Sequence, residues 1–373
     1  MVERALPAWS CPMSLVALFV VPFAVSAVVC WLMIRFGPKD APDGARKVQA
    51  APVPSSGGIG VLSGVVAAAG VLSLFGAPVS GLLQTAPLAG IAAYTVFAAL
   101  VGWADDVYGL PATAKLVALL GGAVMAALIG PQPVLLWIGG GSIAIPWMLG
   151  ALGAAVFMFV MANAVNFMDG ANGIAMGTAL IILLVLAMML VPGTVFSPGE
   201  PAPSLLMALL FAAASALAGF LVWNLPGKLY AGDAGALSTG GLIGGASVLF
   251  ALHGPALAPL TLCLPILVDV FMTLAWRARH GRPLMHAHRD HAYQLLLRSG
   301  WDHGRVARLW WGMTAVCAGA VIAGPFAGAI GAHGLGGLPL DVIVFVALLS
   351  AGIWLWVRQR LTLGRQLEAA TDQ

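Results

Sequence analysis

The sequence contains very few charged residues. Only 8% of its 373 residues are Asp, Glu, Lys or Arg, whereas 61% are hydrophobic, and soluble domains contain about a quarter charged residues. Water cannot be the main solvent of such a chain. The hydrophobic residues form long continuous runs and do not alternate with polar ones, which disfavours a transmembrane β-barrel. A polytopic helical membrane protein is the class that remains.

Cysteine is scarce as well. The four cysteines, Cys11, Cys30, Cys263 and Cys317, lie in or beside apolar runs and lack the CxxC spacing of zinc and redox sites. We therefore expect them to be apolar filling within the membrane and to take no part in metal binding or redox chemistry.

The apolar runs predict eleven membrane-spanning helices, since one span needs about 20 apolar residues. We expect an all-α, polytopic integral membrane protein in which residues 1–373 form one domain. The first run is too long for the apolar region of a cleaved signal peptide, so we expect it to stay in the mature protein. The predicted spans are Ser14–Ile34, Ile59–Val79, Ala86–Gly102, Thr113–Gly130, Trp147–Asn166, Ile174–Val191, Ser204–Val222, Ala236–Leu252, Ala256–Trp276, Val306–Ala327 and Leu338–Val357.

The positions of the cations predict how these spans are oriented. With the loops numbered alternately from an external N-terminus, all of the 17 Lys and Arg residues except Arg4 fall on one side. Cytoplasmic loops of membrane proteins carry this excess of Lys and Arg. We therefore expect the N-terminus outside and the C-terminus inside, with cytoplasmic loops at about residues 35–58, 102–113, 163–173, 223–236 and 277–305.

The polar residues that remain gather in five clusters, each in a predicted cytoplasmic loop or helix end. A transporter usually places ionisable groups near the middle of the membrane, where both sides can reach them, and here only Asp269 is predicted to lie within a span. The pattern therefore favours chemistry on one face of the membrane. The clusters are Ser55–Gly58, Trp103–Tyr108, Asn163–Gly173, Asn224–Gly235 and His286–Gln294.

The first strong signal is the pair Asp105-Asp106, directly after an apolar run. Neighbouring residues on a helix point about 100° apart, so the two carboxylates cannot share one task. One carboxylate could hold a cation while the other approaches an acidic substrate group. A solvated helix end is the simpler alternative for the pair taken alone.

A second signal follows the fifth apolar run, and its residues are spaced by three. Asn163, Asn166 and Asp169 would form one polar stripe on a continuous helix. Amide and carboxylate oxygens suit magnesium or a sugar nucleotide, and Gly170 and Gly173 would let the backbone approach a ligand. Helix capping explains one or two of these residues but does not explain the whole set, which also includes Asn172.

The loop after the seventh run contains Asn224, Lys228 and Gly232-Asp233-Ala-Gly235. An aspartate between glycines, just before a helix, is a reasonable magnesium ligand, and the start of that helix attracts phosphate oxygens. The motif is weak alone, because many such segments are turns with a helix cap.

The fourth signal is dense in imidazole and guanidinium groups. Its candidate ligand-binding residues are His288, Arg289 and His291, which could bind a pyrophosphate through charge-assisted hydrogen bonds. Zinc binding is a competing reading, but the segment lacks the HExxH pattern and nearby cysteines. A solvated surface loop is the other alternative.

Together, these motifs resemble the polyprenyl-phosphate N-acetylhexosamine-1-phosphate transferases, a superfamily that includes phospho-N-acetylmuramoyl-pentapeptide transferase and undecaprenyl-phosphate N-acetylglucosamine-1-phosphate transferase. The resemblance covers about residues 14–357. The family's aspartate pair falls on Asp105 and Asp106, and its glycine-flanked aspartate on Asp233. Its NxxNxxDGxxG stretch and its proline-glycine loop fall on Asn163–Gly173 and Pro54–Gly58.

Two features of the motifs bear on the branch of the superfamily. The position after the second glycine of the aspartate motif, commonly a serine, is Ala236 here. The histidine motif, His288-Arg289-Asp290-His291-Ala292-Tyr293-Gln294, looks like the branch that initiates O-antigen or other surface polysaccharides. It looks less like the peptidoglycan branch.

The resemblance implies transfer of a sugar 1-phosphate from a UDP-N-acetylhexosamine to undecaprenyl phosphate, with release of UMP, at the cytoplasmic face of the bacterial inner membrane. It implies Mg²⁺, or Mn²⁺ in its place, on Asp233 and Asn166. Asp105, Asp106 and Asp233 would be the catalytic residues. Which UDP-sugar is used stays open, as does a homodimer. The residues implied to bind substrate are Asn163, Asn166, Asp169, Asn172, Asn224, Lys115, His288, Arg289 and His291.

Two other classes of function remain open at this stage. A transporter or flippase of lipid-linked sugars would have the same composition. Another magnesium-dependent membrane transferase, such as an aromatic prenyltransferase or a CDP-alcohol phosphotransferase, would also use aspartates. Those transferases space their aspartates in motifs such as DxxxD, which this sequence does not show.

Overall fold

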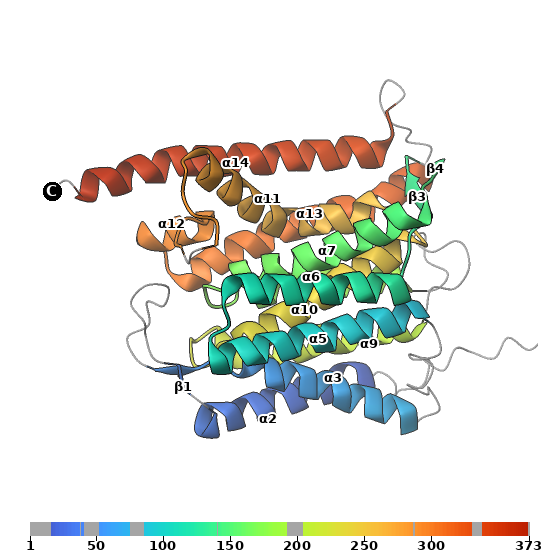
Figure 1. Ribbon diagram of the computed structural model, residues 1–373, viewed down its shortest axis with the longest axis horizontal. Coiled ribbons are helices and arrows are strands. Elements are labelled where there is room, and N and C mark those ends of the chain that lie inside the picture. Colours follow the sequence, from blue (N-terminus) through green and yellow to red (C-terminus); the bar gives the residue numbers. More distant parts are fainter. Residues whose placement is uncertain are drawn as a thin grey trace, which may run out of the picture.

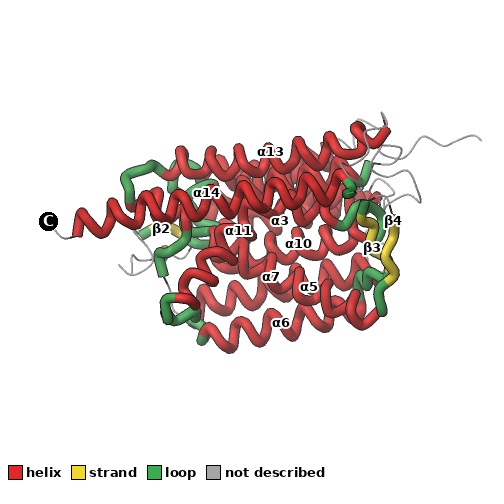
Figure 2. The backbone as a smooth tube through the Cα atoms, turned by 90° about the horizontal axis from the view of Figure 1, so that it is seen from above, coloured by secondary structure: helices red, strands yellow, loops and turns green. Residues whose placement is uncertain are grey.

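The structure is a computed structural model that describes residues 16–37, 39–40, 52–74, 86–139, 141–191, 204–285, 288–329 and 338–371. It is a bundle of helices whose axes run in broadly the same direction (Figures 1 and 2). The helices are α2 (Val21–Phe36), α3 (Gly57–Leu74), α5 (Ala86–Tyr108), α6 (Ala112–Ile129), α7 (Trp147–Met168), α8 (Ile174–Met189), α9 (Ser204–Asn224), α10 (Gly232–Ala251), α11 (Leu257–Arg279), α12 (Ala292–Arg298), α13 (His303–Ala329) and α14 (Leu340–Thr371). A π-helical turn, η2 (Val16–Val20), precedes α2.

The all-α polytopic fold predicted from the sequence is confirmed. Ten helices in the described part of the chain are long and apolar enough to cross a membrane. The remaining predicted span corresponds to α8, which has only 16 residues and is therefore about 24 Å long, shorter than the roughly 30 Å hydrocarbon layer. Most of α8 is buried by other helices. Its length therefore does not have to match the thickness of the hydrocarbon layer.

Several elements differ from the expectation. The short helix α12 was not predicted, α13 begins at His303 and not at Val306, and α14 continues to Thr371, well past Val357. Hydropathy detects only the apolar part of a helix, so polar helical turns beyond the membrane are missed.

Two small antiparallel hairpins lie at opposite ends of the bundle, and the sequence did not predict them. Strand β1 (Lys39–Asp40) pairs with β2 (Val53–Pro54), and β3 (Leu135–Ile138) pairs with β4 (Gly141–Ala144). Figure 2 shows β2 and the β3–β4 hairpin at these opposite ends. Strands of two to four residues are too short to show a periodic pattern.

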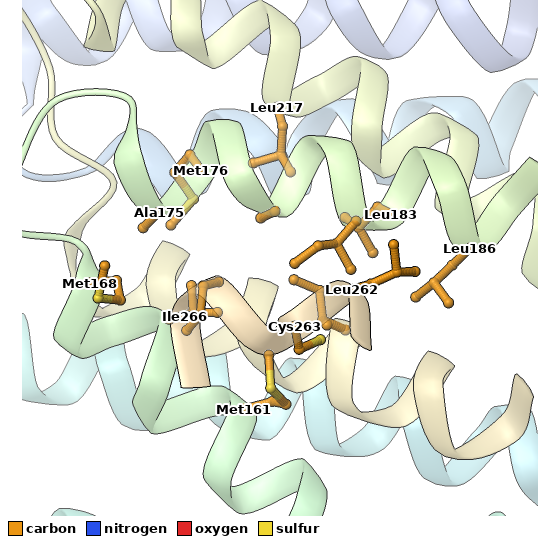
Figure 3. Packing of buried hydrophobic residues seen from close by; sticks show 14 of the residues in the cluster. Met161, Met168, Ala175, Met176, Leu183, Leu186, Leu217, Leu262, Cys263 and Ile266 are labelled. Carbon is orange, nitrogen blue, oxygen red and sulfur yellow. The ribbon is translucent and has the colours of Figure 1, made fainter. Parts of the chain in front are cut away.

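Helix α10 is the centre of the bundle and packs mainly against α5 and α7. It is almost wholly buried, whereas α14 lies along the outside, across the top of Figure 1. The largest hydrophobic cluster joins α7, α8, α9 and α11 (Figure 3), with Met161, Leu183, Leu217 and Leu262 among its fully buried members. This core holds the ends of α7 and α10 in fixed positions, where the polar motifs begin.

Glycines let α10 approach its neighbours closely. A methyl group on Gly240 would overlap the carbonyl oxygen of Met161 in α7, and one on Gly244 would lie 2.8 Å from the Cα of Met158. Small residues at such contacts allow helix backbones to pack together within a membrane.

We therefore expect Gly240→Ala to lower the free energy of unfolding by about 1–3 kcal/mol, because the new methyl group must push α7 away. The matched control is Gly153→Ala in α7, where a methyl group meets open space; it should be neutral or stabilise by about 0.5–1 kcal/mol. Thermal unfolding of the detergent-solubilised variants measures both effects. Equal midpoints for the two variants would contradict the close packing of α10 on α7.

Candidate active site

The polar motifs meet at one end of the bundle, on the left of Figure 1. Their contacts come from the ends of α5, α7, α9 and α11 and the starts of α6, α10, α12 and α13. Part of the histidine cluster, residues 286 and 287, lies outside the described residues, as does most of the loop between α2 and α3. The described motifs thus share one face, as the sequence predicts.

Asp105 and Asp106 lie in the last turn of α5 and have different partners. Oδ1 of Asp105 accepts the backbone N–H of Leu110 (2.8 Å), and its Oδ2 lies 2.6 Å from Nζ of Lys115. The carboxylate of Asp106 instead accepts the backbone N–H groups of Asp233 (3.1 Å) and Ala234 (3.3 Å). The divergence expected for neighbouring helix positions is therefore present.

The ammonium of Lys115, in the first turn of α6, lies between two carboxylates. It pairs with Asp105 and also with Oδ2 of Asp233, in the first turn of α10. Asn166 of α7 completes the group: in the amide orientation that satisfies both of its ends, Nδ2 donates to Asp233 (3.1 Å) and Oδ1 accepts from Lys115 (3.1 Å). We call these four residues the acidic cluster.

The acidic cluster has the donor set of a site for a hard cation. Two carboxylates and an amide oxygen surround one positive charge, and Mg²⁺ prefers such oxygen ligands. The three charged side chains are between 13% and 19% exposed. The cluster is therefore largely shielded from solvent, but its charged groups are not completely buried. Within the described ranges no three His, Cys, Asp or Glu side chains could hold a metal ion together. A cation here would thus take further ligands from water or substrate oxygens.

Asp106 holds the start of α10 in place. Its carboxylate accepts two of the backbone N–H groups that a helix start leaves unpaired. Its negative charge also interacts favourably with the positive end of the helix dipole. Gly102, one turn earlier in α5, permits this contact, because a side chain there would overlap the backbone of Asp233. Asp106 therefore positions Asp233.

The proline-glycine loop before α3 packs on the same helix start. Backbone N–H groups of Gly57 and Gly58 donate to the carbonyls of Tyr230 (2.9 Å) and Ala231 (2.8 Å). A side chain on Gly58 would overlap the backbone of Gly235. The loop therefore also supports the helix start that carries Asp233.

The predicted polar stripe of α7 is only partly assembled at the cluster. Asn166 reaches Asp233, but the amide of Asn163 donates to the carbonyl of Phe159 in its own helix (2.8 Å). Asp169 follows the last residue of α7 and is partly exposed. Asp169 does not continue the stripe with helical spacing, because α7 ends at Met168.

Asn224 and Asn172 lie at the adjoining loops. Asn224 is only 2% exposed; its Oδ1 accepts the N–H of Gly173 (2.7 Å), and its Nδ2 donates to the carbonyl of Leu229 (2.9 Å). The backbone N–H of Asn172 donates to Nδ1 of His303 (3.2 Å). Asn224 thus ties the start of α8 to the segment that leads into α10.

The histidine motif is built around the buried Asp290. Its carboxylate pairs with Arg277 of α11 and lies 3.4 Å from Arg282 and 3.8 Å from Arg360 of α14. Three guanidinium groups around one carboxylate leave an excess of positive charge, which suits an anionic ligand. His288 and Arg289 precede this aspartate and are partly exposed.

The two histidine rings of the motif stack with centroids 5.0 Å apart. Burial, together with the neighbouring His291 ring and the positive charge of Arg277, lowers the pKa of His288 to about 4. His288 is therefore neutral near pH 7 and can offer a ring nitrogen as an acceptor. His291 is almost fully buried.

Helix α7 joins the histidine motif to the acidic cluster. The hydroxyl of Tyr293 donates to the carbonyl of Phe167 (3.1 Å), and the rings of Phe167 and His291 lie 6.2 Å apart. Phe167 directly follows Asn166, which contacts Asp233. The acidic cluster and the cationic histidine motif thus flank the last turn of α7.

Sequence reasoning missed the groups that support these residues. Arg277 and Arg360 were counted only as cytoplasmic cations, and Asp290 and Tyr293 were seen only as parts of the histidine motif. Their partners lie on other helices, so sequence spacing carries no signal for them. Asp269 was the exception, since a carboxylate inside an apolar run stands out.

Fold and site together define a polytopic helical membrane protein with an acidic cluster and a cationic motif at one end. Residues 88–251, which contain the aspartate pair, the asparagine stretch and Asp233, match the family model described as glycosyl transferase family 4. The names of the relatives agree with this match and with the superfamily that the motifs resemble.

Three relatives illustrate the likeness. The chain is 27% identical to decaprenyl-phosphate N-acetylglucosaminephosphotransferase of Mycolicibacterium smegmatis, over 78% of this chain and 77% of that protein. It is 29% identical to phospho-N-acetylmuramoyl-pentapeptide-transferase of Moorella thermoacetica, over 67% and 80%. Identity to the probable undecaprenyl-phosphate N-acetylglucosaminyl 1-phosphate transferase of Bacillus subtilis is 26%, over 75% of each chain.

The lowered pKa of His288 predicts how stability depends on pH. The unfolded chain, in which the pKa is near 6.5, binds a proton between about pH 6.5 and 4, whereas the folded protein does not. Folding stability should therefore fall as the pH falls through this window, by about 1 kcal/mol from His288 at pH 5 once its partial exposure to solvent is allowed for. The drop in unfolding midpoint between pH 7 and pH 5 should be smaller in His288→Gln; an equal drop would show that His288 titrates normally.

Proposed function

We propose that this protein transfers an N-acetylhexosamine 1-phosphate from a UDP-sugar to undecaprenyl phosphate and releases UMP. An oxygen of the acceptor phosphate bonds to the β-phosphorus of the donor. The bond from that phosphorus to the bridging oxygen breaks, and UMP leaves with the bonding electrons. The product is a lipid-linked diphospho-sugar.

The names of the relatives support this class of reaction. They are phosphotransferases for N-acetylglucosamine or phospho-N-acetylmuramoyl-pentapeptide, and those of the N-acetylglucosamine group are named for a polyprenyl phosphate. Their named reactions share one chemical step, the transfer of a phosphoryl-linked sugar. The matched family segment covers the acidic cluster, so the likeness includes the candidate catalytic residues.

The observation that carries the proposal is the acidic cluster beside the cationic histidine motif. Phosphoryl transfer between two anions requires that negative charge be neutralised and that the reacting groups be held in line. The acidic cluster can hold a cation, and the histidine motif provides guanidinium and imidazole groups across α7. The presence of these groups on one face supports the proposal, because they can neutralise and orient two anions.

Mg²⁺, or Mn²⁺ in its place, is the proposed cofactor, and Asp233 with Asn166 would hold it. When bound, it would neutralise the charge that develops on the diphosphate. The oxygen donors of the acidic cluster fit this ion, and the ammonium of Lys115 already lies among them.

The chain's own residues have separate tasks in this proposal. Asp105, fixed by the N–H of Leu110 and by Lys115, orients the acceptor phosphate or accepts its proton. Lys115 places a positive charge between the reacting anions. Asp106 acts by holding the helix start that carries Asp233.

The donor would lie against the ends of α7 and α9 and the histidine motif. His288, Arg289 and His291 are assigned to the diphosphate or the sugar. Asn163, Asp169, Asn172 and Asn224 are assigned to the nucleotide sugar; Asn224 has both amide groups bonded to the backbone, so its contribution is to hold the loops in place.

We further propose that the site faces the cytoplasm at the inner membrane and that the product initiates O-antigen or another surface polysaccharide. The excess of Lys and Arg in the loops on this side supports the orientation. The form of the motif from His288 to Gln294 supports the branch.

Asp233→Asn should lower transfer at least a hundredfold, because the variant loses the charge that holds the cation, while the protein stays folded. UMP release from a panel of UDP-sugars with undecaprenyl phosphate measures this. The matched control is Asp341→Asn, a carboxylate that accepts the N–H of Gly139 at the opposite end of the bundle, which should keep wild-type activity. No UMP release by the wild type, combined with movement of lipid-linked sugar across liposomes, would favour a flippase instead.

Replacing Lys115 by Met tests the cation site without an activity assay. The substitution leaves Asp105 and Asp233 without their shared counter-charge, so repulsion should lower the unfolding midpoint in EDTA. Millimolar Mg²⁺ should then raise the midpoint by several degrees more than it does in the wild type. Lys228→Met, which removes a cation that stacks on Trp223 at the same end, is the control. An unchanged response to Mg²⁺ would remove the cation site from the acidic cluster.

A further inference from the structure

Asp269 is a carboxylate inside α11 that the proposed reaction does not yet use. It is only 2% exposed, and burying a carboxylate costs several kcal/mol unless donors or cations compensate for it. Its contacts therefore indicate what it does.

The compensation comes from the histidine motif at the start of α12, from α14 and from its own helix. Oδ1 of Asp269 accepts the backbone N–H of Ala292 at the start of α12 (2.8 Å) and the indole N–H of Trp356 in α14 (3.2 Å). Thr273 adds a hydroxyl at 3.2 Å. The same oxygen lies 3.6 Å from Nδ1 of His291. The carboxylate is thus the point at which α11, the histidine motif and α14 meet.

We propose that Asp269 is a positioning residue that sets the ring orientation and the proton position of His291. This inference rests on the proposed function, because it assigns His291 to the bound donor. Asp269 acts through His291 and does not itself touch the substrate.

The physical basis is the direction of the imidazole. The negative charge of a carboxylate 3.6 Å from Nδ1 favours a proton on that nitrogen, which leaves Nε2 as the atom available to a ligand. The ring is also restrained by stacking, 5.0 Å from His288 and 5.8 Å from Tyr293. Since Tyr293 bonds to the carbonyl of Phe167, the orientation of His291 is defined relative to the end of α7.

The backbone of the motif is held independently of this ring. Gln359 donates to the carbonyl of Ala292 (3.1 Å), and Arg360 donates to the carbonyl of Asp290. Loss of the charge on Asp269 should therefore disturb His291 more than it disturbs the fold.

The kinetic test uses Asp269→Asn, His291→Gln and the double variant. Asparagine keeps an acceptor oxygen but has no charge. We expect a kcat about 10–100-fold lower in Asp269→Asn, with the KM for the UDP-sugar within about threefold of wild type. If Asp269 acts through His291, the double variant should be no slower than His291→Gln alone. Full additivity of the two losses would overturn the proposal.

Two controls separate positioning from stability. Trp356→Phe removes one donor to the same carboxylate oxygen without changing His291, so it should lower the unfolding midpoint but leave kcat near wild type. Asp341→Asn repeats the chemical change at the other end of the bundle and should leave kcat unchanged. An equal loss of kcat in Trp356→Phe and Asp269→Asn would mean that general destabilisation explains both.

A spectroscopic readout is independent of turnover. In protein labelled with ¹⁵N-histidine, the signals absent from His291→Gln identify His291, and they should show a protonated Nδ1 in the wild type and a changed proton distribution in Asp269→Asn. A wild-type ring protonated only at Nε2 would overturn the proposal, even if Asp269→Asn fails to fold. A protonated Nδ1 in a protein that transfers no sugar phosphate would instead leave the positioning intact and remove the proposed function.

Discussion

The ion pairs of Lys115 with Asp105 and Asp233 are the interaction on which the site depends. Two carboxylates this close together in a largely buried cluster would repel each other strongly without a cation between them. The ammonium balances them, and the backbone contacts made possible by Gly58 and Gly102 bring α3 and α5 against the helix that carries Asp233. The bundle therefore places the ammonium of Lys115 where the ends of α5, α6, α7 and α10 meet. This arrangement requires the glycines, because larger residues would keep the helices apart.

The last turn of α7 links the acidic cluster to the histidine motif. Asn166 faces Asp233, while the next residue, Phe167, receives the hydroxyl of Tyr293 and lies beside the ring of His291. Because neighbouring helix positions diverge by about 100°, one turn of helix can contact both the acidic cluster and the histidine motif. A shift of α7 would therefore change the contacts of both centres.

The helices and the polar motifs could be predicted, because bilayer thickness and helical geometry relate directly to sequence spacing. The divergence of Asp105 and Asp106 follows from the same geometry. The bridging role of Lys115, the arginines around Asp290 and the contacts of Asp269 could not be predicted, since each joins residues of different helices. For Asn163, the periodicity correctly predicted a position on the same helix as Asn166. It did not predict the partner of the side chain, because the amide donates to a carbonyl of its own helix.

Helix α14 shows why a lipid-exposed element can matter to the site. It is the most exposed of the candidate spans in the described chain, yet Trp356, Gln359 and Arg360 reach Asp269, Ala292 and Asp290. The guanidinium of Arg360 also lies 3.5 Å from the ring centroid of Trp276 in α11, a contact that adds about 0.5–2 kcal/mol when it is shielded from water. The outer helix thus holds the histidine motif from the membrane side. Because its opposite face lies toward lipid, the position of this motif depends on how α14 sits in the bilayer, whereas the acidic cluster depends on the buried packing of α10.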